Sequence, residues 1–213
     1  NSQRIWGYET PDGSFSQFAR VQDRQLMERP KHLTWEEAAS MPLVNCTAYR
    51  MLVSPNGAGM RQGDVVLIWG ATGGIGAYAA QYVLNGGGIP VCVVSSSDKA
   101  EILRAMGVAA VIDRRAADYR FWKDENTQDT REWQRLGARI RELTGGRGVD
   151  HAIECIGLKQ TIEDAFGMLV KGGTATVVGM ARFDLKIELP AITFLNERRI
   201  QGSMMGGRSE ERR

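Results

Sequence analysis

The chain has 213 residues, of which 43% are hydrophobic and 24% charged, and its formal net charge at pH 7 is +2. These are ordinary globular proportions, with length for one full domain and part of another. The nearly balanced charge favours neither a nucleic-acid partner nor a membrane surface. The three cysteines have neither disulfide nor metal-ligand spacing, so we expect a cytoplasmic protein without a bound metal. The first residue is not Met, which suggests a fragment.

The first 62 residues differ from the rest of the chain in their sequence pattern. Residues 1–33 contain glycines, prolines and short pieces typical of strands and turns, for example residues 14–21, and we assign them to the end of one domain. Thr34 and Glu37 have the spacing of a capping box, which predicts the start of a helix. Residues 34–62 are therefore expected to be linking helices.

A glycine-rich turn follows directly after an apolar run, in the sequence GDVVLIWGATGGIG at residues 63–76. Glycines let the backbone approach a pyrophosphate, and the free N–H groups at the start of the next helix face its charge. No Gly-Lys-Ser/Thr follows, which argues against a phosphate-binding P-loop. The turn predicts dinucleotide binding by Gly70, Ala71, Thr72, Gly73, Gly74 and Ile75.

Strand-like and helix-like segments alternate from this turn onward. Short apolar runs without strict alternation indicate strands buried on both faces, at residues 65–69, 89–95, 110–113, 150–154, 174–178 and 199–203. Helices are expected between them, including residues 99–106 and 161–170, each ended by glycine. The prediction is an α/β Rossmann fold over residues 63–213, with a doubly wound parallel sheet.

A highly charged stretch separates the third and fourth predicted strands. Fifteen of the thirty residues 113–142 are Asp, Glu, Lys or Arg, and Trp122 and Trp133 lie among them. The favoured interpretation is a solvated helical insertion. The alternative is a subunit contact anchored by the two tryptophans.

The end of the second strand distinguishes the two nicotinamide cofactors. An NAD site usually has an acidic residue there, whereas this chain has Ser95 and Ser96, with Lys99 and Arg114 close by. Hydroxyls and positive charge suit a 2′-phosphate, so NADPH is the expected cofactor. Asp98 leaves NAD open, because a shift of a few residues in register would return a carboxylate to the strand end.

Several motifs resemble those of crotonyl-CoA carboxylase/reductase, within the medium-chain dehydrogenase/reductase superfamily. They include IWGYET at 5–10, HLTWEEAA at 32–39, NGAGM at 56–60 and YRFWKDE at 119–125. The resemblance implies that a GroES-like β domain precedes the Rossmann domain, and that NADPH reduces a short 2-enoyl-CoA whose enolate captures carbon dioxide. It also implies that Tyr8 and Glu9 help to hold the carbon dioxide, and a homo-oligomer is expected.

The sequence departs from this family after the fourth strand. The family has a His in a Phe-Glu-His-Pro-Gly context, whereas residues 153–157 read IECIG and place Cys155 there. A neutral thiol is a poor hydrogen-bond donor, so carboxylation is doubtful and simple reduction is expected. From residue 145 onward, the sequence resembles the alcohol-dehydrogenase branch of the superfamily. Further cofactor contacts are expected from Thr47, Ile156, Gly157, Val178, Gly179 and Met180.

Two other functions stay open. In zinc alcohol dehydrogenases, one zinc ligand is a Cys or Glu near a position where this chain has Met41, Pro42 and Leu43, none of which binds zinc well. Cys46 is nearby, and we expect it to be a buried small hydrophobe. The remaining alternative is a non-catalytic fragment that only binds nucleotide.

Overall fold

The computed structural model describes residues 6–7, 10–124, 127 and 129–203. The chain divides into two compact units, Asn1–Met41 and Pro42–Arg213. The division falls between two consecutive helices, α1 (Trp35–Ser40) and α2 (Pro42–Leu52).

The first unit has little regular structure. A 3-10 helix, η1 (Asp23–Gln25), precedes α1. The predicted capping box is confirmed: the Glu37 amide donates to Thr34 Oγ1 at 3.2 Å, and Glu37 Oε2 accepts from the Thr34 amide at 2.8 Å. The prediction of strand pieces over residues 14–21 is wrong, because the described residues of this unit form no strand. A strand needs a partner for its backbone groups, and this part of the chain offers none.

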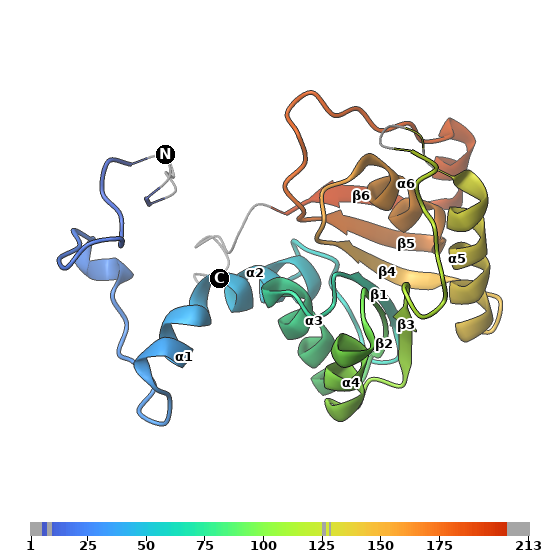
Figure 1. Ribbon diagram of the computed structural model, residues 1–213. Helices are drawn as coiled ribbons and strands as arrows, with labels where there is room; N and C mark the ends of the chain where they lie inside the picture. The colour runs from blue at the N-terminus through green and yellow to red at the C-terminus, as the bar shows by residue number, and fades with distance from the viewer. Residues whose placement is uncertain (1–5, 8–9, 125–126, 128, 204–213) are drawn as a thin grey trace. The chain divides into compact units, whose positions relative to one another are not determined.

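The second unit is built on one parallel sheet of six strands (Figure 1). The strands are β1 (Val65–Trp69), β2 (Ile89–Val94), β3 (Ala110–Asp113), β4 (Val149–Glu154), β5 (Leu169–Val177) and β6 (Arg199–Gly202). Their order across the sheet is β3-β2-β1-β4-β5-β6, and each neighbouring pair is parallel. This is the doubly wound Rossmann topology, as the alternation in the sequence predicts.

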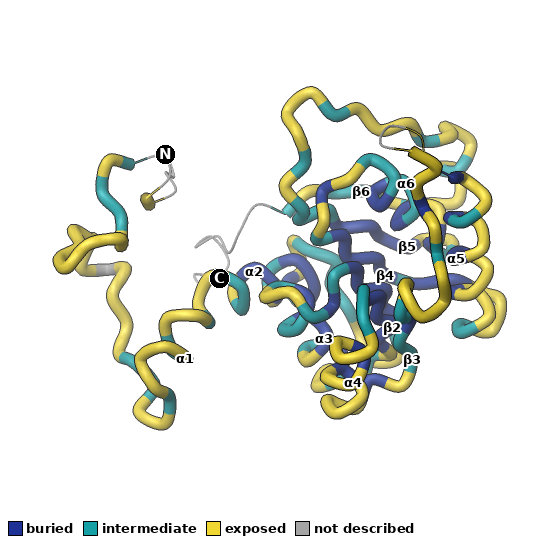
Figure 2. The backbone as a smooth tube through the Cα atoms, in the orientation of Figure 1, coloured by how far each residue is buried: buried dark blue, intermediate teal, exposed yellow. Residues whose placement is uncertain are grey.

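Helices cover both faces of the sheet. On one face, α2, α3 (Gly74–Asn85) and α4 (Ser97–Ala105) bury their apolar side chains against β1 and β2. On the other face, α5 (Thr130–Leu143) and α6 (Lys159–Gly167) pack on the same strands and on β4 and β5. A 3-10 helix, η2 (Ala191–Asn196), lies in the connection to β6. Figure 2 shows the sheet as the buried centre of this unit. Within the described residues, no helix has both the length and the apolar character to cross a bilayer.

The boundary between α6 and β5 differs from the prediction. The helix expected over residues 161–170 ends at Gly167, and Leu169 already belongs to β5. Leu169 pairs with Val149 of β4, and the Val149 amide donates to the Met168 carbonyl at 3.0 Å. Pairing with the neighbouring strand therefore overrides the helical pattern of these residues.

The charged stretch contains the helix that links β3 to β4. Helix α5 exposes its charged face, whereas Trp133, Leu136 and Ile140 are buried in the core. The Trp133 indole is only 6% exposed, stacks on Phe121 with ring centroids 3.9 Å apart, and lies 5.8 Å from Trp69. The hypothesis that Trp133 anchors a subunit contact is therefore wrong, because the core of its own domain already covers it.

The two tryptophans of this stretch should differ in their effect on stability. Replacing Trp133 by Ala should lower the free energy of unfolding by about 3 kcal/mol or more, because it leaves a cavity between aromatic rings. The matched change of Trp122, which is 46% exposed, should cost less than about 1 kcal/mol. Urea unfolding followed by circular dichroism measures both, and equal losses would contradict the assigned core.

Candidate nucleotide-binding site

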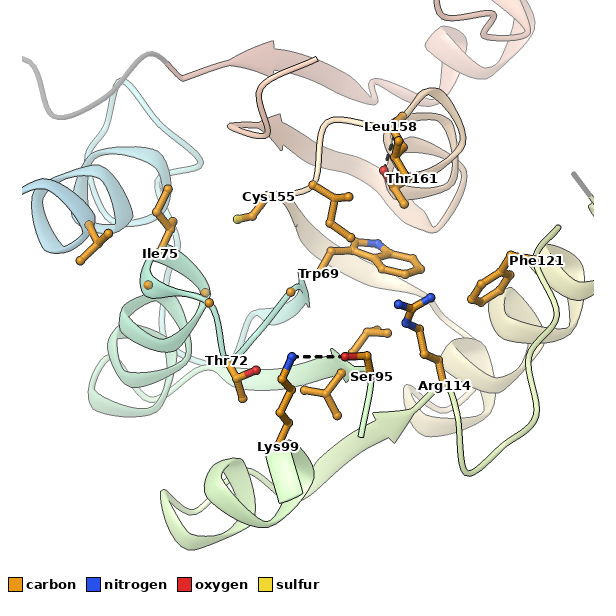
Figure 3. Close-up of a pocket in the computed structure, with 18 of the residues that line it drawn as sticks. Trp69, Thr72, Ile75, Ser95, Lys99, Arg114, Phe121, Cys155, Leu158 and Thr161 are labelled. Atoms are coloured by element: carbon orange, nitrogen blue, oxygen red, sulfur yellow. Dashed lines mark hydrogen bonds between the residues drawn. The ribbon is translucent and has the colours of Figure 1, made fainter. Parts of the chain in front are cut away.

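A cleft of about 560 Å³ opens at the carboxyl ends of the central strands. In open parallel sheets, ligands bind at this edge, where the strand order reverses between β1 and β4. Figure 3 shows the cleft between the turn after β1, the end of β2 and the loop after β4. Ten residues predicted as site residues line it together: Gly70, Thr72, Gly73, Gly74, Ile75, Ser95, Lys99, Arg114, Cys155 and Ile156.

The turn between β1 and α3 supplies the backbone N–H groups of the cleft. Gly73 is the N-cap of α3 and donates its own N–H to the Gly70 carbonyl at 2.9 Å. A Cβ at Gly76 would collide with the Gly70 carbonyl oxygen, so only glycine allows α3 to start this close to the strand. The first amides of α3 have no partner within the helix and carry its positive dipole end, which suits a phosphate.

The β2 side of the cleft carries hydroxyl and cationic groups. Strand β2 ends at Val94, so Ser95 is the first residue beyond it. Lys99 Nζ donates to Ser95 Oγ at 3.3 Å, and the amide of Arg114 donates to the Val94 carbonyl at 3.0 Å. Asp98 lies in the first turn of α4, is exposed and does not line the cleft. The strand register therefore places Ser95, and not Asp98, at the strand end.

An aromatic wall closes the cleft opposite α3, and the sequence analysis did not assign it to the site. Trp69, Phe121, Trp122 and Trp133 all line the cleft. Tyr119 stacks on Phe121 with ring centroids 5.5 Å apart, and the Arg135 guanidinium of α5 lies 4.1 Å from the centre of the Tyr119 ring. For three of the rings that line the cleft, the sequence signal is that aromatic residues recur through the stretch 119–133, although the charge of this stretch predicts a solvated face.

The loop after β4 brings a thiol to the cleft. Cys155 is half-buried and follows Glu154, the fully buried last residue of the strand. Burial, reinforced by the Glu154 carboxylate, raises the pKa of the Cys155 thiol to about 12. A thiol with such a pKa stays protonated at neutral pH and is neither a nucleophile nor a base there.

Several other predicted site residues lie outside the cleft lining. The Thr47 hydroxyl is buried and donates to the Leu43 carbonyl at 2.7 Å, and Ala71 is fully buried in the core. The remaining ones follow strand ends without reaching the cleft: Ser96, Gly157, Val178, Gly179 and Met180. Tyr8 and Glu9 lie outside the described residues.

No metal site forms in the described part of the chain. Nowhere in it do three or more His, Cys, Asp or Glu side chains come together in a way that could hold an ion. Cys46 is exposed, which corrects the prediction that it is buried: helix α2 buries Thr47, Ala48, Met51 and Leu52, and Cys46 lies outside this buried face. The described residues do not fit a zinc ion.

The sequence matches a family model, Zinc-binding dehydrogenase, over residues 74–213. The chain belongs to this family. A crotonyl-CoA reductase of Streptomyces collinus is 59% identical over 174 residues, which are 82% of this chain and 39% of the relative. The crotonyl-CoA carboxylase/reductase of Cereibacter sphaeroides is 40% identical over 211 residues, 95% of this chain and 48% of the relative. The chain thus spans less than half the length of these curated relatives.

A solved structure shares the fold of the chain. It is the 2-octenoyl-CoA carboxylase reductase CinF, from a Streptomyces species, in complex with NADP and 2-octenoyl-CoA. Its TM-score is 0.84 at 39% identity, and the match covers 98% of this chain and 47% of that one. The predicted resemblance to medium-chain dehydrogenases/reductases, and to crotonyl-CoA carboxylase/reductases within them, is confirmed.

The raised pKa of Cys155 predicts low reactivity. At pH 8, iodoacetamide should modify the exposed Cys46 at least about tenfold faster than Cys155, because only the thiolate attacks. Mass spectrometry of the digested protein measures both rates in one sample, with the fully buried Cys92 as an internal negative control. Labelling of Cys155 as fast as that of Cys46 would contradict the protonated thiol.

Proposed function

We propose that the complete gene product is an NADPH-dependent reductase of 2-enoyl-CoA thioesters. The observation that carries the proposal is the charge of the cleft. Lys99 and Arg114 stand beside Ser95 at the β2 end, and the described residues that line the cleft include no Asp or Glu. A 2′-phosphate finds two cations and no carboxylate there, which favours NADP over NAD. The names of the relatives, and the NADP and octenoyl-CoA in the CinF complex, support the same cofactor and substrate class.

Three parts of the cofactor would bind at three places along the carboxyl edge of the sheet. The pyrophosphate would lie on the turn from Gly70 to Ile75, at the positive end of α3. The 2′-phosphate would be held by Ser95, Lys99 and Arg114, which line the cleft. The nicotinamide end would lie toward the loops after β4 and β5, near Ile156, Gly157 and residues 178–180, with Thr47 behind it. When bound, NADPH supplies a hydride to the activated double bond of the thioester.

The fate of the resulting substrate enolate would depend on Cys155. At this position the related carboxylases are expected to have an imidazole, which can donate a strong hydrogen bond to carbon dioxide or its product. The protonated, half-buried thiol of Cys155 is a weak donor and carries no charge. We therefore propose that protonation ends the reaction and that a saturated acyl thioester is released. The roles of Tyr8 and Glu9, the GroES-like assignment of residues 1–33, the homo-oligomer and the cytoplasmic location stay predictions.

The proposal is tested by analysing the products of the complete gene product with crotonyl-CoA and NADPH, with and without bicarbonate. Mass spectrometry should find butyryl-CoA in both samples. Ethylmalonyl-CoA as the main product with bicarbonate would refute the role given to Cys155 while keeping the reductase. No oxidation of NADPH would refute the reductase itself.

The matched variant Cys155→His sharpens this assay. It restores a strong hydrogen-bond donor at the β4 end, and it should raise the carboxylated share of the product by about tenfold, the effect of one good hydrogen bond. Cys155→Ala is the control, because it alters the same position without supplying a hydrogen-bond donor, and it should leave the product ratio unchanged. An unchanged product ratio in the His variant would show that Cys155 does not decide the outcome.

A further inference from the structure

Glu154 is a buried charged group that the proposed chemistry leaves unused. It is the last residue of β4, its side chain is 0% exposed, and it does not line the cleft. Taking a carboxylate out of water is costly unless hydrogen bonds replace the lost hydration. A buried carboxylate at the carboxyl edge of the sheet therefore needs hydrogen-bond partners that offset this cost.

The carboxylate accepts hydrogen bonds from the loop that follows β4 and from the start of α6. Oε1 accepts from the amides of Ile156 at 2.8 Å and Gly157 at 2.9 Å. The Thr161 hydroxyl lies 2.9 Å from Oε1 and 2.9 Å from the Leu158 carbonyl oxygen, so these two acceptors share its single proton. Oε2 accepts from the Gly157 amide at 3.1 Å. Charge-assisted bonds to backbone N–H groups are among the stronger ones in proteins. The loop that carries Cys155 is therefore held by its backbone, and not by the thiol itself.

The main chain of Glu154 holds the neighbouring loop as well. Its carbonyl oxygen accepts from the amides of Val178 at 2.8 Å and Gly179 at 3.0 Å, just beyond the end of β5. The two loops touch: a Cβ at Gly179 would collide with the Gly157 amide nitrogen. One residue thus ties together both loops at this part of the sheet edge.

We propose that Glu154 is a positioning residue: its carboxylate holds the loop after β4, its main-chain carbonyl holds the loop after β5, and together they set the place of Cys155 and Ile156 in the cleft. The effect on the cleft is independent of the substrate. Only the consequence for turnover rests on the proposed function.

A carboxylate is the side chain that this position requires. Three donors converge on it, and its two oxygens offer lone pairs to all of them. The nearly isosteric Gln has one acceptor oxygen and an NH₂ group, which would face an amide N–H donor. In the variant Glu154→Gln the Gly157 amide therefore loses its bond to the second oxygen and meets an NH₂ group there, and the bonds to the first oxygen lose the charge that strengthens them, so the loop is held less firmly.

The test is the rate at which iodoacetamide modifies Cys155 in the folded complete gene product. Glu154→Gln should raise this rate about tenfold, because a buried hydrogen bond is lost and the loop opens. Cys46, on α2, is the internal reference and should not change. The control variant is Asp164→Asn, which alters another partly buried carboxyl, on α6, whose Oδ1 accepts from Gln160 at 2.9 Å and does not touch the loop. Equal Cys155 rates in the two variants would overturn the proposal.

A second variant separates position from charge. Thr161→Val removes one donor and keeps the Glu154 charge, so the thiol gains no electrostatic help in ionising. Labelling of Cys155 should still rise about threefold, in keeping with the loss of one hydrogen bond. This variant also serves if Glu154→Gln does not fold. A rate equal to that of the unmodified protein would mean that the carboxylate acts only through its charge.

Turnover provides the functional measurement. With crotonyl-CoA and NADPH, Glu154→Gln should lower kcat by about tenfold and change the KM for NADPH less than threefold, because the 2′-phosphate end of the cleft is untouched. A rise in KM without a fall in kcat would contradict a positioning role near the reacting end. If the unmodified protein does not turn over crotonyl-CoA, the proposed function fails, whereas the labelling experiment still decides the role of Glu154.

Discussion

The close approach of helix α3 to the end of strand β1 is the constraint on which the cleft depends. Gly76 has no room for a Cβ against the Gly70 carbonyl, and this contact lets the first amides of α3 point into the opening between β1 and β4. Any larger side chain there would push the helix outward and turn its positive end away from the anion site. Lys99 and Arg114 can bind the 2′-phosphate of the same cofactor only because the N-terminal end of α3 is positioned to bind its pyrophosphate.

The far side of the cleft is built on a different principle. There, the loops after β4 and β5 are held by the buried Glu154 carboxylate, by the Glu154 carbonyl and by their own backbone contact. Neighbouring aromatic rings, from Trp69 through Trp133 to Phe121, support the wall beside them. Rigid supports of this kind keep the loop after β4 in place without using the side chain of Cys155.

Much of this arrangement could be predicted from the sequence, and the failures have physical causes. The six strands were found because burial on both faces demands short apolar runs, and the glycine turn because few residues tolerate its geometry. The end of α6 was misplaced because the pairing of Leu169 with Val149 is a long-range contact. The sequence does not predict the burial of Trp133, because the many charged residues of α5 obscure its single apolar face. The role of Glu154 is invisible in sequence, since its partners are backbone amides.

The central claim is that the cleft selects a 2′-phosphate through cations at the end of β2. The most direct measurement is the ratio of the dissociation constants of NADH and NADPH for the complete gene product, from isothermal titration calorimetry at one ionic strength. NADPH should bind at least about tenfold more tightly, as expected for charge-assisted bonds to Lys99 and Arg114. Equal affinity for the two cofactors, or tighter binding of NADH, would contradict it.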